Sequence, residues 1–289
     1  MNNNGYLNEF DTYLKNVKHS SESTRQSYLR DLGQFLRFYS EDLLLAETDD
    51  LNRYIAQLRS DGRSASTVAR NIASLKAFYK YYFSIGIMKS NPALGLETEK
   101  IVQIAPEVLS EREVELLLDQ PQCTDLKGYR DKAMLELLYA TGIRVSELVC
   151  LRVADVDLQN GTILCRGGKG RSVPLSPSAI KAVTEYIAFI RKQMVRDLDE
   201  EILFVNINGN PMTRQGFWKI LKGYQVKAGI QKNITPHTLR HSFAVHLLEK
   251  GENMKSVRKI MGQSELSATG IYADFVRELD GKTKKSYNR

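Results

Sequence analysis

The 289-residue chain has no apolar run close to the roughly 18 residues that a membrane-spanning helix needs. It begins MNNNGYLNEF, which lacks the basic start and the apolar stretch of a secretion signal. Its three cysteines, Cys123, Cys150 and Cys165, are widely spaced, match no zinc-binding pattern and cannot all pair with one another. We therefore expect a cytoplasmic protein with reduced thiols, no membrane contact, and a core that needs neither metal nor disulfides.

A nucleotide-binding loop is also missing. The glycine-rich segment GGKG at residues 167–170 does not fit the phosphate-binding pattern G-x-x-x-x-G-K-[ST]. No low-complexity segment occurs either. We expect no bound nucleotide and no other cofactor.

Positive charge is what the chain has in excess, and most of it lies late in the sequence. The formal net charge is +7, yet the first hundred residues hold 13 basic and 12 acidic residues. From residue 214 to the end there are 15 basic and 6 acidic residues. Such a cationic region favours a polyanion as partner, with nucleic acid first, although a solvated basic surface is the plainer alternative.

The first hundred residues show the period of amphipathic helices. Two runs have the i, i+3, i+4, i+7 spacing of one helix face: Leu32, Phe35, Leu36 and Tyr39, then Leu75, Phe78, Tyr79 and Tyr82. Each run follows a Ser-Thr pair suited to capping a helix, Ser23-Thr24 and Ser66-Thr67. We favour two helices of one bundle over an internal duplication, with the aromatic side chains in the core. The basic residues expected on the outer faces, and so available to phosphates, are Arg25, Arg30, Arg63, Arg70 and Lys76.

The pair Asn91-Pro92 ends this region, because proline disfavours helix in the residue before it. Residues 97–106 have mixed polarity and no period, which indicates a linker between residues 1–96 and 107–289. Ser110 and Glu113 then fit a capping box ahead of an apolar stripe at Val114, Leu117 and Leu118.

The second region is mixed. Residues 133–140 predict a buried helix that stops at Gly142. Residues 162–165 and 172–175 predict two strands of a hairpin around the GGKG turn. Residues 203–205 are either another strand or a short connection, and the chain from residue 213 onward is mostly helical in pattern.

Several short motifs carry residues suited to phosphate chemistry. In TPHTLRHSFAVHLL (residues 235–248), Thr235 and Pro236 predict a helix start. His237 and Arg240 then share one face near an anion-binding helix N-terminus. We interpret the neighbouring histidines, His241 and His246, as structural residues or phosphate neighbours.

Other candidates are weaker when each is taken alone. Arg144, in ATGIRVSEL, follows a glycine turn, and Glu147 is its expected buried partner, although a surface Arg-Glu pair also explains them. Lys169 lies at the predicted hairpin tip, and Tyr272 lies in a short polar run near the C-terminus. A basic turn and a core or surface tyrosine are their plainer interpretations.

Read in order, Arg144, Lys169, His237, Arg240 and Tyr272 make the chain resemble the tyrosine recombinase (phage integrase) family, specifically its Xer-like branch. The resemblance covers nearly the whole chain, including the segments NPALGL, LSEREVELLL, ATGIRVSEL and HTLRHSFAVHLL. It implies a mainly α fold with a small β-sheet: a helical, SAM-like core-binding domain at residues 1–96 and a mixed α/β catalytic domain at residues 107–289. It also implies a tetramer, homomeric or heteromeric, on double-stranded DNA with specific recombination sites, with C-terminal segments exchanged between protomers.

The resemblance assigns a role to each motif. Tyr272 attacks a DNA phosphate and forms a 3′-phosphotyrosine, while Arg144 and Arg240 hold the phosphate oxygens. His237 accepts a proton or donates a hydrogen bond, and Lys169 protonates the departing 5′-oxygen. Neither ATP nor a metal is needed in such a reaction.

Two departures from the family pattern stand out. The family usually has histidine, or sometimes tryptophan, where this chain has Gln263, nine residues before Tyr272. Glutamine donates only a neutral hydrogen bond, so we expect an active but slow enzyme. The hairpin is also short, which either moves Lys169 or lets Arg171 share its role.

Rival functions are a DNA-binding regulator on a catalytically impaired recombinase scaffold, a relaxing type IB topoisomerase, and a generic helical adaptor. Gln263 favours the first, whereas Tyr272 and the two arginines oppose it. Dimer resolution, integration and DNA inversion all remain open, with a mild preference for a specialised recombinase. The target site and the need for a sister recombinase or an accessory protein are also open.

Overall fold

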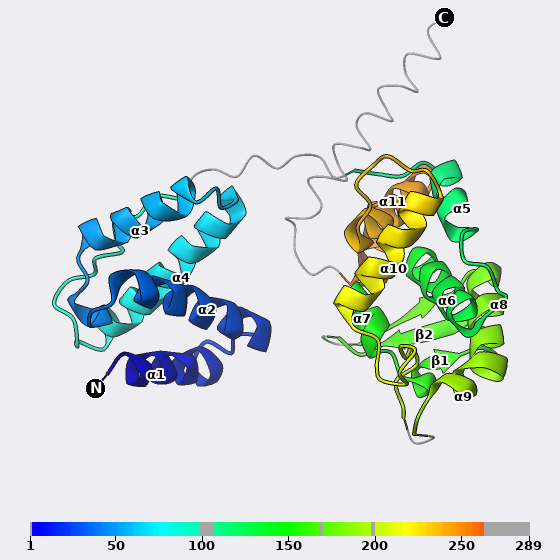
Figure 1. Ribbon diagram of the computed structural model, residues 1–289, viewed down its shortest axis with the longest axis horizontal. Coiled ribbons are helices and arrows are strands. Elements are labelled where there is room, and N and C mark those ends of the chain that lie inside the picture. Colours follow the sequence, from blue (N-terminus) through cyan, green and yellow to red (C-terminus); the bar gives the residue numbers. More distant parts are fainter. Residues whose placement is uncertain (1, 99–106, 168–169, 198–199, 263–289) are drawn as a thin grey trace, which may run out of the picture. The chain divides into compact units, whose positions relative to one another are not determined.

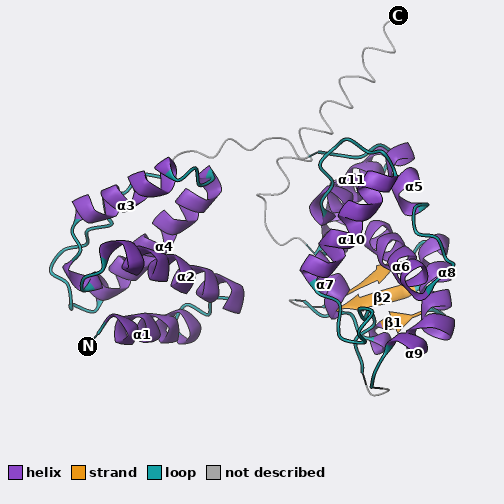
Figure 2. Ribbon diagram, in the orientation of Figure 1, coloured by secondary structure: helices purple, strands orange, loops and turns teal. Residues whose placement is uncertain are grey.

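The computed structural model describes residues 2–98, 107–167, 170–197 and 200–262. The chain divides into two compact units, Met1–Gln103 and Ile104–Arg289, and each unit has its own hydrophobic core. Helices dominate both units, and the second also contains a small sheet (Figure 2). The predicted fold class, mainly α with a small β-sheet, is confirmed. In the described ranges, no helix combines the length and the apolar character that a membrane span requires.

The N-terminal unit is a bundle in which α2 packs against its neighbours on both sides of the sequence. Its elements are α1 (Asn3–Asn16), α2 (Glu22–Tyr39), the 3-10 helix η1 (Leu43–Leu45), α3 (Thr48–Ser60) and α4 (Ala65–Ser84) (Figure 1). Phe35, Phe78, Tyr79 and Tyr82 are fully buried, so the predicted aromatic core is confirmed. The hydroxyls of Tyr79 and Tyr82 each donate to a backbone carbonyl at 2.8 Å, which satisfies their polar ends inside the core.

The predicted helix caps were wrong. Ser21 and Ser64 are the N-caps of α2 and α4, and their hydroxyls accept hydrogen bonds from the backbone N–H groups of Thr24 and Thr67. The hydroxyls of the two threonines lie 2.8 and 2.9 Å from the capping hydroxyls. An N-cap side chain reaches the residue two or three positions further on, so the earlier serine caps the helix and the Ser-Thr pair lies inside its first turn.

Two of the arginines expected on outer faces instead tie helices of this unit together. Arg25 of α2 binds both carboxylate oxygens of Asp11 in α1, at 2.7 and 2.8 Å. Arg70 of α4 donates to the carboxylate of Asp31 in α2 at 2.6 Å, and Asp31 is only 2% exposed. Both guanidinium groups are therefore engaged within the unit, and we do not count them among the phosphate contacts.

The second unit is built around α6, which contacts α5, α8, α11 and β3 (Figure 1). Its elements are α5 (Glu111–Leu118), α6 (Leu126–Thr141), α7 (Val145–Cys150), η2 (Val153–Asp155), β1 (Val156–Asp157), β2 (Thr162–Cys165), β3 (Arg171–Pro174), α8 (Pro177–Glu185), the π-helical η3 (Tyr186–Ile190), α9 (Arg191–Met194), α10 (Arg214–Lys227), α11 (Pro236–Glu249) and α12 (Met254–Met261). The predicted capping box at Ser110 is present at α5, and Gly142 ends α6 as predicted, with a φ of +56°. A Cβ at Gly142 would lie 2.2 Å from the ring of Phe243, so close packing also requires glycine there.

The sheet is antiparallel in the order β1-β2-β3. The predicted hairpin is confirmed with β3 shifted by one residue, and Ile163 lies opposite Val173 while Cys165 lies opposite Arg171. Ile163, Cys165 and Val173 face the core of the unit, as strand alternation requires. Residues 203–205 are a buried connection that makes only an isolated bridge, from Val205 to Pro211.

Candidate active site

The N-terminus of α11 presents two of the candidate residues. Thr235 caps the helix by accepting from the backbone N–H of Thr238 at 3.1 Å, and Pro236 occupies the first turn, as predicted. This start exposes His237 near the positive end of the helix dipole. Arg240, one turn later, is only 4% exposed.

The buried Arg240 joins three elements. Its Nη1 donates to the carbonyl oxygen of Gly142, at the end of α6, and its Nη2 donates to that of Met261 at 2.7 Å. Met261 is the last residue of α12. Because Gly142 lies two residues before Arg144, these bonds bring the two arginine-bearing segments together.

Arg144 is the N-cap residue of α7, and 44% of its side chain is exposed. Its Nη2 donates weakly to the carbonyl of Gly262, at 3.4 Å. The two guanidinium groups, Arg144 and Arg240, therefore reach adjacent carbonyls at the end of α12.

Glu147 has a different partner from the one expected. Arg171 binds its two carboxylate oxygens at 2.6 and 3.0 Å, whereas the side chain of Arg144 comes no closer than 3.9 Å. Glu147 also accepts the backbone N–H of Arg144 at 2.8 Å. Burial opposes ionisation of this carboxyl, but the hydrogen bonds from Arg171 and from the Arg144 backbone hold the pKa of Glu147 below its usual value. The pair with Arg171 forms because the planar fork of a guanidinium matches a carboxylate in this bidentate geometry.

The charges of the two arginines act on His237. Partial desolvation lowers the pKa of His237, and the positive charges of Arg240 and Arg144 lower it further. Burial, together with His237 and Arg240, lowers the pKa of the neighbouring His241 to about 4. At neutral pH the His237 imidazole is therefore neutral beside two cations and is able to accept a proton.

Three of the predicted site residues, Arg144, His237 and Arg240, thus come together in the structure. Lys169, Gln263 and Tyr272, and the tip of the hairpin with them, lie outside the described residues.

Known protein families and relatives match nearly the whole chain. Residues 107–278 match the phage integrase family, and residues 7–84 match its N-terminal SAM-like domain. The chain is 40% identical to the tyrosine recombinase XerD of Oceanobacillus iheyensis, over 98% of this chain and 97% of that protein. It is 41% identical to the protein of the same name from Listeria innocua, over 93% of each.

The chain belongs to the phage integrase family. The predicted class of enzyme, a tyrosine recombinase of the Xer-like branch, is confirmed by these relatives. The fold agrees with a crystal structure of the XerH site-specific recombinase bound to a palindromic difH substrate, with a TM-score of 0.74 and 20% identity over 98% of this chain and 85% of that one.

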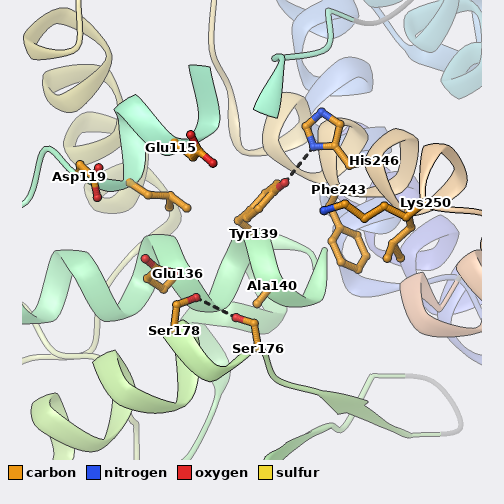
Figure 3. A pocket seen from close by; sticks show the side chains of 12 residues that line it. Glu115, Asp119, Glu136, Tyr139, Ala140, Ser176, Ser178, Phe243, His246 and Lys250 are labelled. Atoms are coloured by element: carbon orange, nitrogen blue, oxygen red, sulfur yellow. Dashed lines mark hydrogen bonds between the residues drawn. The ribbon is translucent and has the colours of Figure 1, made fainter. Parts of the chain in front are cut away.

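A pocket in the catalytic unit of this recombinase is separate from the arginines. It has a volume of about 450 Å³ and lies between α5, α6, α8 and α11 (Figure 3). His246 lines it and lies 2.9 Å from the hydroxyl of Tyr139. His246 follows His237 by nine residues, or two and a half helical turns, so the two side chains lie on opposite sides of α11. Of the predicted site residues that the structure describes, Arg144, His237 and Arg240, none lines this pocket. His246 is buried in a structural contact.

Sequence reasoning missed the part that Arg171 plays. The short hairpin suggested only that Arg171 shares the role of Lys169, and its partner Glu147 could not be foreseen because it lies 24 residues earlier in the chain. Within the described ranges, no group of three or more His, Cys, Asp or Glu side chains is arranged to hold a metal ion.

Proposed function

We propose that this tyrosine recombinase cleaves and rejoins double-stranded DNA at specific sites through a 3′-phosphotyrosine on Tyr272. The observation that supports this best is the meeting of Arg144, His237 and Arg240 at one place, with both arginine charges acting on the histidine. A scissile phosphate is the ligand that suits two guanidinium groups and a neutral imidazole.

Cleavage begins with attack on phosphorus by the Tyr272 oxygen. A free tyrosine has a pKa of about 10, so its proton must be removed as the new bond forms, and His237 is the acceptor. The P–O5′ bond breaks, and Lys169 gives a proton to the leaving 5′-oxygen. Arg144 and Arg240 stabilise the charge that develops on the non-bridging oxygens in the transition state.

Rejoining is the reverse reaction with a different strand. The 5′-hydroxyl of a partner strand attacks the phosphotyrosine, and Tyr272 is released. Because the phosphodiester is conserved in the covalent link, the cycle needs no ATP. The cationic side chains supply the charge stabilisation that a metal ion supplies in other enzymes of phosphate chemistry, so we propose a reaction without a metal.

Gln263 is the proposed fourth contact to the phosphate. A neutral donor in place of a cationic one reduces transition-state stabilisation by about 1–3 kcal/mol, or about ten- to a hundredfold in rate. We therefore propose a slow but active enzyme. Its assembly on two DNA sites is a tetramer, homomeric or with a sister recombinase, in the cytoplasm.

The test is to trap the intermediate. The protein is incubated with nicked suicide substrates that carry candidate sites from its own genome, and covalent adducts are sought on a denaturing gel. An adduct that is lost in Tyr272→Phe supports the proposal. Tight binding without an adduct, on a site that a relative cleaves, would instead support a DNA-binding regulator on an impaired scaffold.

A further inference from the structure

Arg171 connects three elements of the catalytic unit. It is the first residue of β3, and its side chain is 14% exposed. Nη1 and Nη2 donate to Glu147 in the first turn of α7, at 2.6 and 3.0 Å, and Nε donates to the carbonyl of Ile260 in α12 at 2.8 Å. A single guanidinium group thus holds the end of α12 to the sheet and to the start of α7.

Two glycines make room for the ion pair of Arg171 and Glu147. A Cβ at Gly262, which has a φ of +62°, would lie 2.6 Å from Cζ of Arg171. A Cβ at Gly167 would lie 3.3 Å from Oε1 of Glu147. Gly262 therefore serves both the left-handed end of α12 and the close approach of the guanidinium group.

Three arginines donate hydrogen bonds to three successive carbonyls at the end of α12. Arg171 donates to Ile260, Arg240 to Met261 and Arg144 to Gly262. A helix C-terminus carries partial negative charge and unpaired carbonyls, so cations stabilise it there. The bond from the half-exposed Arg144 is long, at 3.4 Å, and is the one most readily given up to a phosphate.

Arg171 is in a different position from Arg144. Each of its three nitrogen atoms already donates to a protein oxygen. Burial favours the neutral form, but the hydrogen bond to Glu147 outweighs it and raises the pKa of Arg171 above its usual value. A guanidinium that stays charged is a poor proton donor, so Arg171 is not suited to share the role of Lys169.

We propose that Arg171 is a positioning residue for the nucleophile. By fixing the last turn of α12 against β3 and Glu147, it sets the point from which the chain runs ten residues to Tyr272. A displacement of this point displaces the attacking oxygen, and a shift of about 1 Å costs as much as a hundredfold in rate. This inference rests on the proposed role of Tyr272.

The first variant is Arg171→Lys, which keeps the charge but lacks the planar fork that spans two carboxylate oxygens and a carbonyl. Single-turnover cleavage of a suicide substrate at saturating protein should slow by about ten- to a hundredfold. The Kd for the same DNA should change little, because Arg171 makes no phosphate contact in this scheme. Cleavage at the wild-type rate would overturn the inference.

A sulfur-substituted substrate separates two routes by which loss of Arg171 could slow cleavage. One is misplacement of the nucleophile Tyr272, and the other is an effect through the hairpin that carries the acid Lys169. In a 5′-bridging phosphorothiolate the leaving group is a thiolate, which needs no proton from an acid because a thiol has a pKa of about 8.5. The substrate should restore cleavage by Lys169→Ala, whose missing group is the acid. It should leave Arg171→Lys slow, because attack by Tyr272 is still misplaced. Equal restoration of both variants would show that Arg171 acts through the hairpin, and the inference would be wrong.

Two further variants complete the test, one as a control for folding and one that weakens the same clamp. Arg191→Lys is the matched control, because Arg191 is also buried and also donates to backbone carbonyls, those of Ile202 and Leu203, away from the arginine cluster. It should lower the melting temperature without slowing cleavage at a temperature where it is folded.

Glu147→Gln weakens the same clamp from the other side. Like Arg171→Lys, it should therefore slow cleavage of both the ordinary and the sulfur-substituted substrate, and a normal rate would contradict the inference.

The result with the wild-type protein distinguishes failure of the positioning role of Arg171 from failure of the proposed function. If it forms a Tyr272-dependent adduct on both substrates and Arg171→Lys is equally fast, only the positioning role is wrong. If it forms no such adduct on a cleavable site, both the proposed function and this inference are overturned.

Discussion

His237 lies in an environment that opposes its own protonation. Desolvation and then the charges of Arg240 and Arg144 hold the pKa of His237 below its usual value in the DNA-free protein. A bound phosphate brings negative charge to the same place and offsets the two guanidinium groups. The pKa of His237 should therefore rise when DNA binds.

From this rise we predict proton uptake on DNA binding. His237 is neutral in the free protein and partly protonated in the complex at pH values between its two pKa values, so affinity should increase as the pH falls through that window. Calorimetry at about pH 6, in buffers of different ionisation enthalpy, measures the protons taken up. The uptake should fall in His237→Gln; the same uptake in that variant would assign it to another group, with His241 the first candidate.

The neutral side chain of Gln263 is expected to limit the rate of DNA cleavage. A histidine there would donate a charge-assisted hydrogen bond to the phosphate, and such bonds are about twice as strong as neutral ones. We predict that Gln263→His speeds single-turnover cleavage by about tenfold or more. DNA affinity, measured in parallel, controls for tighter binding. An unchanged cleavage rate would remove Gln263 as the reason for a slow enzyme.

At the scale of elements, the β2–β3 hairpin carries Lys169 between strands whose register is fixed by Ile163 opposite Val173. Lys169→Ala removes the proposed acid but leaves this register in place. We predict DNA binding within about twofold of the wild type and cleavage slower by about a hundredfold or more, the size of general acid catalysis. If the variant cleaves as fast as the wild type, Lys169 has no part in the mechanism.

Local patterns in the sequence predicted several elements, because such patterns report interactions within a few residues. The capping box at Ser110, the helix stop at Gly142 and the start of α11 at Thr235 were all predicted correctly for this reason. The two-residue strand β1 carries too little periodicity to be predicted. The caps of α2 and α4 were placed two residues late, since serine and threonine occur both at the N-cap and inside the first turn.

Contacts between residues that are far apart in the chain could not be predicted from the sequence. Glu147 was assigned to Arg144, three residues before it, because proximity along a helix is the only proximity that a sequence displays. The hairpin instead brings Arg171 to this carboxylate from 24 residues away. The contacts of Arg171 and Arg240 with the end of α12 could not be predicted for the same reason, since they depend on how three elements, β3, α11 and α12, pack together.

At the scale of the whole molecule, the two units have separate cores and different charge. The first hundred residues are nearly neutral, and the excess of basic residues lies in the second unit from residue 214 onward. Separate cores imply that a defect in one unit leaves the other folded. The position of the single tryptophan, Trp218 in α10 of the second unit, makes this implication testable.

Phe78 is fully buried in the first core, and Phe204 is fully buried in the second. Phe78→Ala should destabilise the first unit by about 3–5 kcal/mol, the usual cost of such a truncation. With an m-value of about 1–3 kcal/mol/M in urea, part of the circular dichroism transition should move to a urea concentration lower by about 1 M or more. Tryptophan fluorescence, which reports the second unit, should keep its midpoint.

Phe204→Ala is the matched control, and it should lower the midpoint of the fluorescence transition instead. The two variants together test the independence of the units, because each removes the same side chain from one core only. If Phe78→Ala moves the fluorescence midpoint as far as the circular dichroism midpoint, the units unfold as one cooperative block. The N-terminal unit would then contribute to the stability of the catalytic unit, and truncation to residues 107–289 would be expected to weaken the site formed by Arg144, His237 and Arg240.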